Sequence, residues 1–145
     1  MLGIPLWTIG LALAVRTPSA QLFAPSVAAE IVGWSLLAAG CVLMVLALGA
    51  LRGRAALPSP FDPLIQHGPY AYVRHPIHGG LLLSLVALVL LRPTQVAGLA
   101  AALGIVWVVV QSRLEELDLV QRLPAYRGYM ARVPRFFPRM RGRTA

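Results

Sequence analysis

The chain has 145 residues, of which 58% are hydrophobic and 12% charged, and its mean hydropathy is +0.72. This composition excludes an ordinary soluble domain and predicts an all-α integral membrane protein. All 13 basic residues are arginine, so the formal net charge of +8 is permanent. Eight of these arginines follow the last apolar stretch, as is typical of a cytoplasmic tail. We therefore expect anionic lipid headgroups, and not nucleic acid, as the charged partner.

Four apolar stretches predict about four transmembrane helices, the last two of which form a C-terminal helical hairpin. The stretches cover residues 2–15, 27–51, 77–91 and 96–110. Spanning a bilayer takes about 20 residues, so only the second is comfortably long and the others must borrow flanking residues. The fourth is expected to continue as a helix until Pro124, because residues 111–123 contain no Gly or Pro. The short link 92–95 requires an antiparallel turn.

The distribution of arginine predicts that both chain termini face the cytoplasm. The loop 52–74 carries three arginines and the C-terminal tail carries eight, whereas the turns on the other side carry only Arg16 and Arg92. The loop and the tail would then meet on the cytoplasmic side of the cell membrane. They are expected to form the cofactor site of a multi-pass protein there.

The chain is expected to form a single domain, because it has no internal repeat and no low-complexity linker. This domain covers residues 1–145, with the N-terminal helices in 1–57 and the polar motifs in 58–145. The first apolar stretch lacks a basic start and a convincing cleavage site, so we expect a retained helix and not a signal peptide. Cys41 is the only cysteine, which excludes an intrachain disulfide.

Two polar motifs flank the predicted hairpin and indicate a site at the membrane surface. The first is the loop 67–76, which reads HGPYAYVRHP and gathers aromatic, imidazole and guanidinium side chains. The second begins at the end of the last helix and comprises Arg113, Glu115, Glu116, Tyr126, Tyr129 and residues 133–135. Acidic residues so close to lipid are costly, so we expect the two glutamates to have a function.

Helix geometry separates the roles of the two glutamates. Adjacent residues of an α-helix point about 100° apart, because one turn takes about 3.6 residues. Arg113 and Glu116 are three residues apart and are expected to form an ion pair. Glu115 is then left to accept hydrogen bonds from a ligand.

The ordered set of motifs resembles the isoprenylcysteine carboxyl methyltransferase and phospholipid methyltransferase superfamily, whose members are integral-membrane enzymes that use S-adenosyl-L-methionine. The resemblance covers about residues 63–138 and rests on Gly68-Pro69-Tyr70, Tyr72-Val73-Arg74-His75-Pro76, Gly79, Glu115-Glu116, Tyr126, Tyr129 and Val133-Pro134-Arg135. It implies methyl transfer to a lipophilic or lipid-attached acceptor at the cytoplasmic membrane surface. Family members usually have Tyr in place of His78 and Phe-Gly in place of Leu123-Pro124.

The resemblance also implies the site residues. Its implied catalytic residues are Arg74 and Arg113. Its implied cofactor-binding residues are Leu64, Ile65, Gly68, Tyr70, His75, Pro76, Ile77, His78, Glu115 and Glu116. Methyl transfer from a sulfonium needs alignment and exclusion of water more than an acid or a base. Arg74, Glu115 and Tyr70 suit the carboxylate, the ribose and the adenine of the cofactor, respectively.

Two other functions fit parts of the sequence. Membrane sterol and steroid reductases, which bind NADPH, look similar around Arg-His-Pro but generally continue with Asn-Tyr and an acidic residue, whereas this chain reads Ile77-His78-Gly79-Gly80. A non-catalytic membrane scaffold also fits the short spans. Arg74 could be a snorkelling anchor, and Tyr72 and Tyr129 could belong to an interfacial aromatic belt. The methyl acceptor stays open among carboxylate, amine, hydroxyl and thiol, because apolar walls do not encode the nucleophile.

No metal site is expected from the sequence. His67, His75 and His78 lie close together along the chain, but Pro76 breaks the helical spacing and no carboxylate follows nearby.

Overall fold

The computed structural model describes residues 17–51 and 64–138, and helices account for most of both ranges. The elements in chain order are α2 (Val27–Leu51), the 3₁₀ helix η1 (Gly68–Ala71), α3 (Pro76–Leu91), α4 (Gln95–Arg122) and α5 (Tyr126–Arg132). The described ranges contain no β-strand, so the expected all-α class is confirmed for them. The first predicted span, 2–15, lies outside the described residues.

The other three predicted helices form at the expected places. α2 covers the second apolar stretch, and α4 continues beyond the fourth stretch to Arg122, as the absence of Gly and Pro predicts. The Thr94 side chain caps α4 by accepting a hydrogen bond from the backbone N–H of Ala97 at 3.3 Å. Pro76 occupies the first turn of α3. A backbone N–H at this position would have no partner within the helix, so proline costs no hydrogen bond there.

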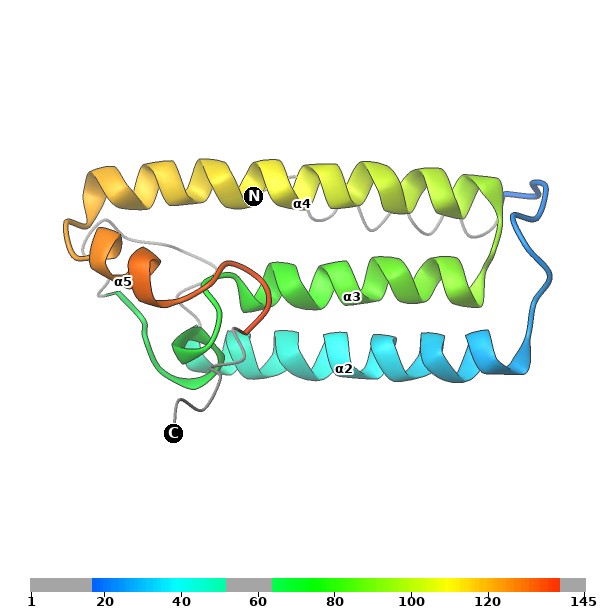
Figure 1. Ribbon diagram of the computed structural model, residues 1–145, viewed down its shortest axis with the longest axis horizontal. Helices are drawn as coiled ribbons and strands as arrows, with labels where there is room; N and C mark the ends of the chain where they lie inside the picture. The colour runs from blue at the N-terminus through cyan, green and yellow to red at the C-terminus, as the bar shows by residue number, and fades with distance from the viewer. Residues whose placement is uncertain (1–16, 52–63, 139–145) are drawn as a thin grey trace, which may run out of the picture.

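The three long helices lie side by side, with α3 between α2 and α4 (Figure 1). α3 and α4 are joined by a tight turn and run antiparallel, as predicted. The segment before α2 is held against this turn, because Leu22 donates its backbone N–H to Pro93 at 2.7 Å and Gln95 donates to Ala20 at 2.9 Å. At the opposite end of the bundle α2 and α4 finish and α3 begins. The short elements η1 and α5 lie at that end.

α2 and α4 have the length and hydropathy of membrane-crossing helices, with 25 and 28 residues. α3 is apolar too but has only 16 residues. Large apolar side chains face outward on α2 and on α4. Val45 on α2 is 67% exposed, and Leu103 on α4 is 61% exposed. Two described helices thus meet the criterion for a span, while the total of four stays a prediction.

Two glycines let α2 and α3 approach closely. A Cβ atom added at Gly40 would lie 2.6 Å from the carbonyl oxygen of Gly80, and one added at Gly80 would lie 2.6 Å from that of Gly40. Carbonyl groups of a helix backbone cannot swing aside as a flexible side chain can. Small residues are therefore required on both helices at this crossing.

We expect Gly40→Ala to lower the stability of the purified protein by about 1–3 kcal/mol, because the methyl group forces α2 away from α3. Gly49→Ala is the matched control, since a Cβ there meets nothing within 4 Å. The control should be neutral or slightly stabilising, because alanine favours a helix by up to about 1 kcal/mol over glycine. Thermal unfolding in detergent measures both, and equal midpoints would contradict the close crossing.

Candidate active site

The candidate site forms where the loop before α3 meets the tail after α5. The backbone N–H of Arg74 donates to the carbonyl oxygen of Pro134 at 2.9 Å, and that of His75 donates to Arg135 at 3.0 Å. These two bonds hold the loop and the tail together beside the last turns of α4. Polar side chains from three separate parts of the chain consequently gather at one end of the bundle.

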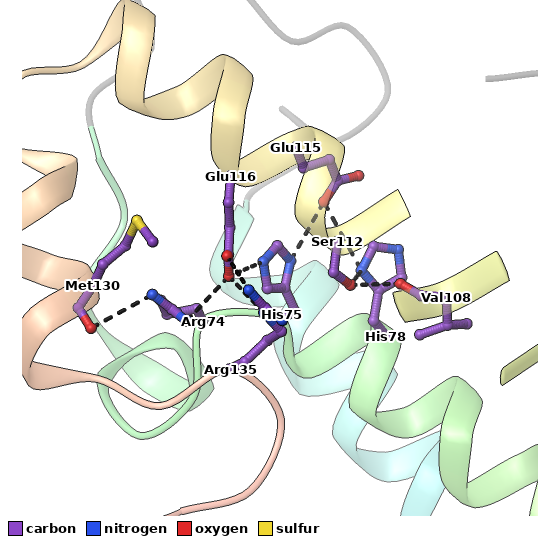
Figure 2. Close-up of polar contacts among 9 residues, drawn as sticks. All are labelled: Arg74, His75, His78, Val108, Ser112, Glu115, Glu116, Met130 and Arg135. Carbon is purple, nitrogen blue, oxygen red and sulfur yellow. Dashed lines mark hydrogen bonds and ion pairs between the residues drawn. The ribbon is translucent and has the colours of Figure 1, made fainter. Parts of the chain in front are cut away.

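Glu116 is the centre of this polar cluster. It is 4% exposed, and its Oε1 lies 3.2 Å from Arg74 Nη2 and 3.1 Å from His75 Nε2. Arg135 binds both carboxylate oxygens, with Nε 3.0 Å from Oε1 and Nη2 2.5 Å from Oε2 (Figure 2). One buried carboxylate is thus matched by two guanidinium groups and one imidazole, which is the arrangement that a buried charge requires.

The predicted ion pair between Arg113 and Glu116 is wrong. Arg113 was the predicted partner, but its side chain is exposed and the ion pairs of Glu116 go to Arg74 and Arg135. The spacing of three residues allowed a pair along the helix, yet the buried carboxylate faces the loop and the tail. Arg113 instead lines a small pocket of about 320 Å³, together with Glu116 and Arg135.

Glu115 lies on the neighbouring side of α4 and is less enclosed. Its side chain is 42% exposed, and its Oε2 lies 3.4 Å from His75 Nδ1 and 3.9 Å from His78 Nδ1. The imidazole of His75 therefore stands between two carboxylates (Figure 2). Both ring nitrogens of His75 face a carboxylate oxygen, and carboxylates accept hydrogen bonds, so each nitrogen is placed to donate one.

His78 is held by α4. Its Nδ1 lies 2.9 Å from the hydroxyl of Ser112, and that hydroxyl lies 2.7 Å from the carbonyl oxygen of Val108. The ring of His78 stacks on that of His75 with centroids 5.4 Å apart and meets Trp107 edge-on at 6.3 Å. The two imidazoles therefore form one packed pair between α3 and α4.

Arg74 keeps one donor without a partner. Its Nη1 donates to the carbonyl oxygen of Met130 at 3.4 Å, and its Nη2 pairs with Glu116. Its Nε is the one buried side-chain N or O atom in the described part of the chain that lacks a hydrogen-bond partner. A buried donor without a partner is costly, so this atom is suited to a ligand acceptor.

Tyrosines support the loop from the tail side. Tyr126 and Tyr129 are both 2% exposed, and the Tyr129 hydroxyl donates to the carbonyl oxygen of Tyr70 at 2.6 Å. Burial raises the pKa of Tyr129 to about 12 against the opposing effect of Arg74, so the phenol keeps its proton for this bond. Tyr72, in contrast, is 68% exposed, as an interfacial aromatic residue would be.

The structure brings most of the expected site residues to this end of the bundle. Arg74, His75, His78, Glu115 and Glu116 form the cluster, and Pro76 and Ile77 lie in the first turn of α3. Gly68 begins η1 with a φ of 60°, a conformation that favours glycine. Tyr70 lies in the same 3₁₀ helix. Its pKa is raised mainly by burial and further by the neighbouring Tyr129 and Glu115. Leu64 and Ile65 are half-buried before η1, and their role stays a prediction.

Two residues of the cluster were absent from the expected site. Arg135 belongs to a quoted motif, but nothing in its spacing shows that it reaches Glu116. Ser112 has a local signal, because it precedes Glu116 by four residues and so shares its side of the helix.

His75, His78 and Glu115 offer ligand atoms that lie within 4.8 Å of one another, a spacing suited to a metal ion. The argument that no carboxylate lies near these histidines is therefore wrong, because α4 brings Glu115 to them. Ser112 already occupies Nδ1 of His78. We consequently assign these groups to hydrogen bonding.

The fold and the cluster define a helical membrane protein with a buried polar site at one end of its bundle. A family model described as phospholipid methyltransferase matches residues 28–123, and the chain therefore belongs to this methyltransferase family of the isoprenylcysteine and phospholipid methyltransferase superfamily. The match runs from α2 to the end of α4 and stops before Arg135. No curated protein and no solved structure shows a significant match.

We expect Glu116→Gln to destabilise the protein by about 3–5 kcal/mol, because it leaves the buried Arg74 and the partly buried Arg135 without a counter-charge. Asp118→Asn is the control on the same helix, since it removes an exposed ion pair with Arg122 that is worth under about 1 kcal/mol. Thermal unfolding of both variants in detergent is the measurement. Similar losses of stability would show that Glu116 does not organise this end of the bundle.

Proposed function

We propose that this protein transfers a methyl group from S-adenosyl-L-methionine to a lipophilic or lipid-attached acceptor at the cytoplasmic surface of the cell membrane. The observation that supports this most is the ion pair of His75 with the half-exposed Glu115, next to the buried guanidinium of Arg74. The Nε donor of this guanidinium has no hydrogen-bond partner among the described residues. Membership of the phospholipid methyltransferase family supports the reaction class.

The donors and acceptors of the cluster suit the polar parts of this cofactor. Arg74 Nε is a buried donor without a partner and suits a carboxylate. The half-exposed carboxylate of Glu115, whose Oε2 lies 3.4 Å from His75 Nδ1, is an acceptor and suits hydroxyl or ammonium donors. When bound, the cofactor supplies an electrophilic methyl group on a sulfonium. The residues of the chain bind and orient the reactants and exclude water, which is the main requirement of such a transfer.

An apolar pocket beside the cluster suits the hydrocarbon part of the acceptor. It has a volume of about 580 Å³, within the usual range for ligand sites, and is lined by α2, η1 and the tail. Phe136 connects it to the cluster, because this residue lines the pocket and its ring lies 6.1 Å from that of His75. Each methylene group buried there contributes about 0.8 kcal/mol, so a lipid chain would bind without any polar contact.

We expect the protein in nanodiscs to bind S-adenosyl-L-methionine and not NADPH. Glu115→Gln and His75→Ala should each raise the dissociation constant more than tenfold, because a hydrogen bond to a charged group contributes about 1.5–3 kcal/mol. Asp118→Asn should leave it unchanged. Calorimetry gives the dissociation constants, and thermal unfolding identifies any variant that has lost its fold. Tight binding of NADPH without a response to S-adenosyl-L-methionine would favour the reductase.

The cytoplasmic location of the site is tested by labelling single cysteines in a Cys41→Ser background. Gln121→Cys lies at the cluster end of α4, and Gln95→Cys at its opposite end, both at exposed positions. A membrane-impermeant maleimide added to intact cells should label position 95 and leave position 121 unlabelled until the cells are permeabilised. The reverse pattern would put the cluster outside the cell.

A further inference from the structure

A hydrogen-bond chain fixes where His78 carries its proton. The carbonyl oxygen of Val108 can only accept, so the Ser112 hydroxyl at 2.7 Å donates to it. The oxygen of that hydroxyl then accepts from His78 Nδ1 at 2.9 Å, which places the proton on Nδ1. Glu115 Oε2, 3.9 Å from the same nitrogen, favours the proton there as well. A neutral His78 therefore keeps its lone pair on Nε2.

The Nε2 atom of His78 makes no contact that fixes its role. No hydrogen bond to it occurs among the described residues, and the side chain is 13% exposed. The groups around the ring are His75 stacked on it from α3, with Ser112, Glu115 and the edge of Trp107 from α4. Burial is the largest effect and lowers the pKa of His78, so the ring favours its neutral form, while the Glu115 carboxylate on the Nδ1 side opposes this shift.

Other residues of the cluster are less suited to accept a proton. Arg74 and Arg135 stay protonated at any physiological pH. The Tyr129 phenol donates its proton to a carbonyl oxygen, and Glu116 is fully engaged by guanidinium groups. His75 has a carboxylate oxygen beside each of its ring nitrogens and lies in the part of the cluster assigned to the cofactor.

We propose that Nε2 of His78 accepts the proton released by the methyl acceptor, which is therefore an amine, a hydroxyl or a thiol and not a carboxylate. This inference rests on the proposed function and restricts the nucleophile, which the function leaves open, to a group that carries a proton. A bond forms between the nucleophilic atom and the methyl carbon, while the bond from that carbon to sulfur breaks and leaves its electron pair on sulfur. The proton of the nucleophile moves to Nε2. A carboxylate acceptor has no proton to release and would gain nothing from this base.

Four probes with the same alkyl chain test the nucleophile directly: dodecylamine, dodecanethiol, para-dodecylphenol and dodecanoate. Full-length protein in nanodiscs is given each probe with methyl-labelled S-adenosyl-L-methionine, and label in the extracted probe is counted. We expect transfer to at least one of the three probes that carry a proton and none to dodecanoate. This arm needs no variant, so misfolding cannot obscure it.

His78→Asn tests the base, because the asparagine amide keeps an N–H near the position of Nδ1 while Nε2 is removed. We expect kcat on the accepted probe to fall about 100-fold, as for loss of a general base, and the dissociation constant of the cofactor is measured separately because the resemblance also implies contact of His78 with the cofactor. Ser112→Ala removes the hydroxyl that holds the proton of His78 on Nδ1. It should lower kcat less than His78→Asn does and leave cofactor affinity unchanged. His67→Gln, at an exposed position in the loop, is the control and should retain full activity.

The outcomes separate the two proposals. A wild-type protein that does not bind the cofactor would overturn the proposed function, and the inference with it. Cofactor binding with transfer to dodecanoate alone, or to none of the probes, would overturn only the role of His78. A folded His78→Asn protein with wild-type kcat would do the same.

Discussion

The buried charge of Glu116 is the constraint on which the polar end of the molecule depends. A carboxylate removed from water must be matched by charged partners, and neither of its arginine partners lies on α4. Arg74 comes from the loop and Arg135 from the tail, and their backbones are hydrogen-bonded to each other's segments. The desolvation of one side chain is therefore offset only when loop, helix and tail come together. The residues that build the site are therefore also those that hold this end of the bundle together.

The two adjacent glutamates have different roles, since Glu116 holds the structure together and Glu115 is the proposed ligand-binding residue. Because neighbouring residues of a helix point about 100° apart, Glu116 faces inward while Glu115 remains 42% exposed. His75 lies between the carboxylates and contacts both, so any movement of the structural glutamate changes the orientation of the imidazole that faces the other one. This contact links the stability of the cluster to the geometry of the proposed cofactor site.

The sequence predicts what depends on local pattern. Hydropathy identifies α2, and the absence of Gly and Pro predicts that α4 reaches Arg122. The order of the motifs indicates the family, which the family match confirms. The partner of Glu116 could not be found in this way, because spacing along one helix offers Arg113 and says nothing of a tail that returns to the cluster. The carboxylate beside the histidines was missed for the same reason, since another helix supplies it.

One stripe of α4 contacts both histidines. Val108, Ser112 and Glu116 follow one another at intervals of four residues, so they lie on the same side of the helix and face the start of α3. Glu116 accepts from His75 at Nε2, and the Ser112 hydroxyl accepts from His78 at Nδ1. His75 therefore has a carboxylate oxygen beside each ring nitrogen, whereas Nε2 of His78 makes no hydrogen bond to the described residues. A local feature, the spacing of three residues in the first turn of α3, brings the rings together, but only the packing of α3 against α4 makes them chemically different.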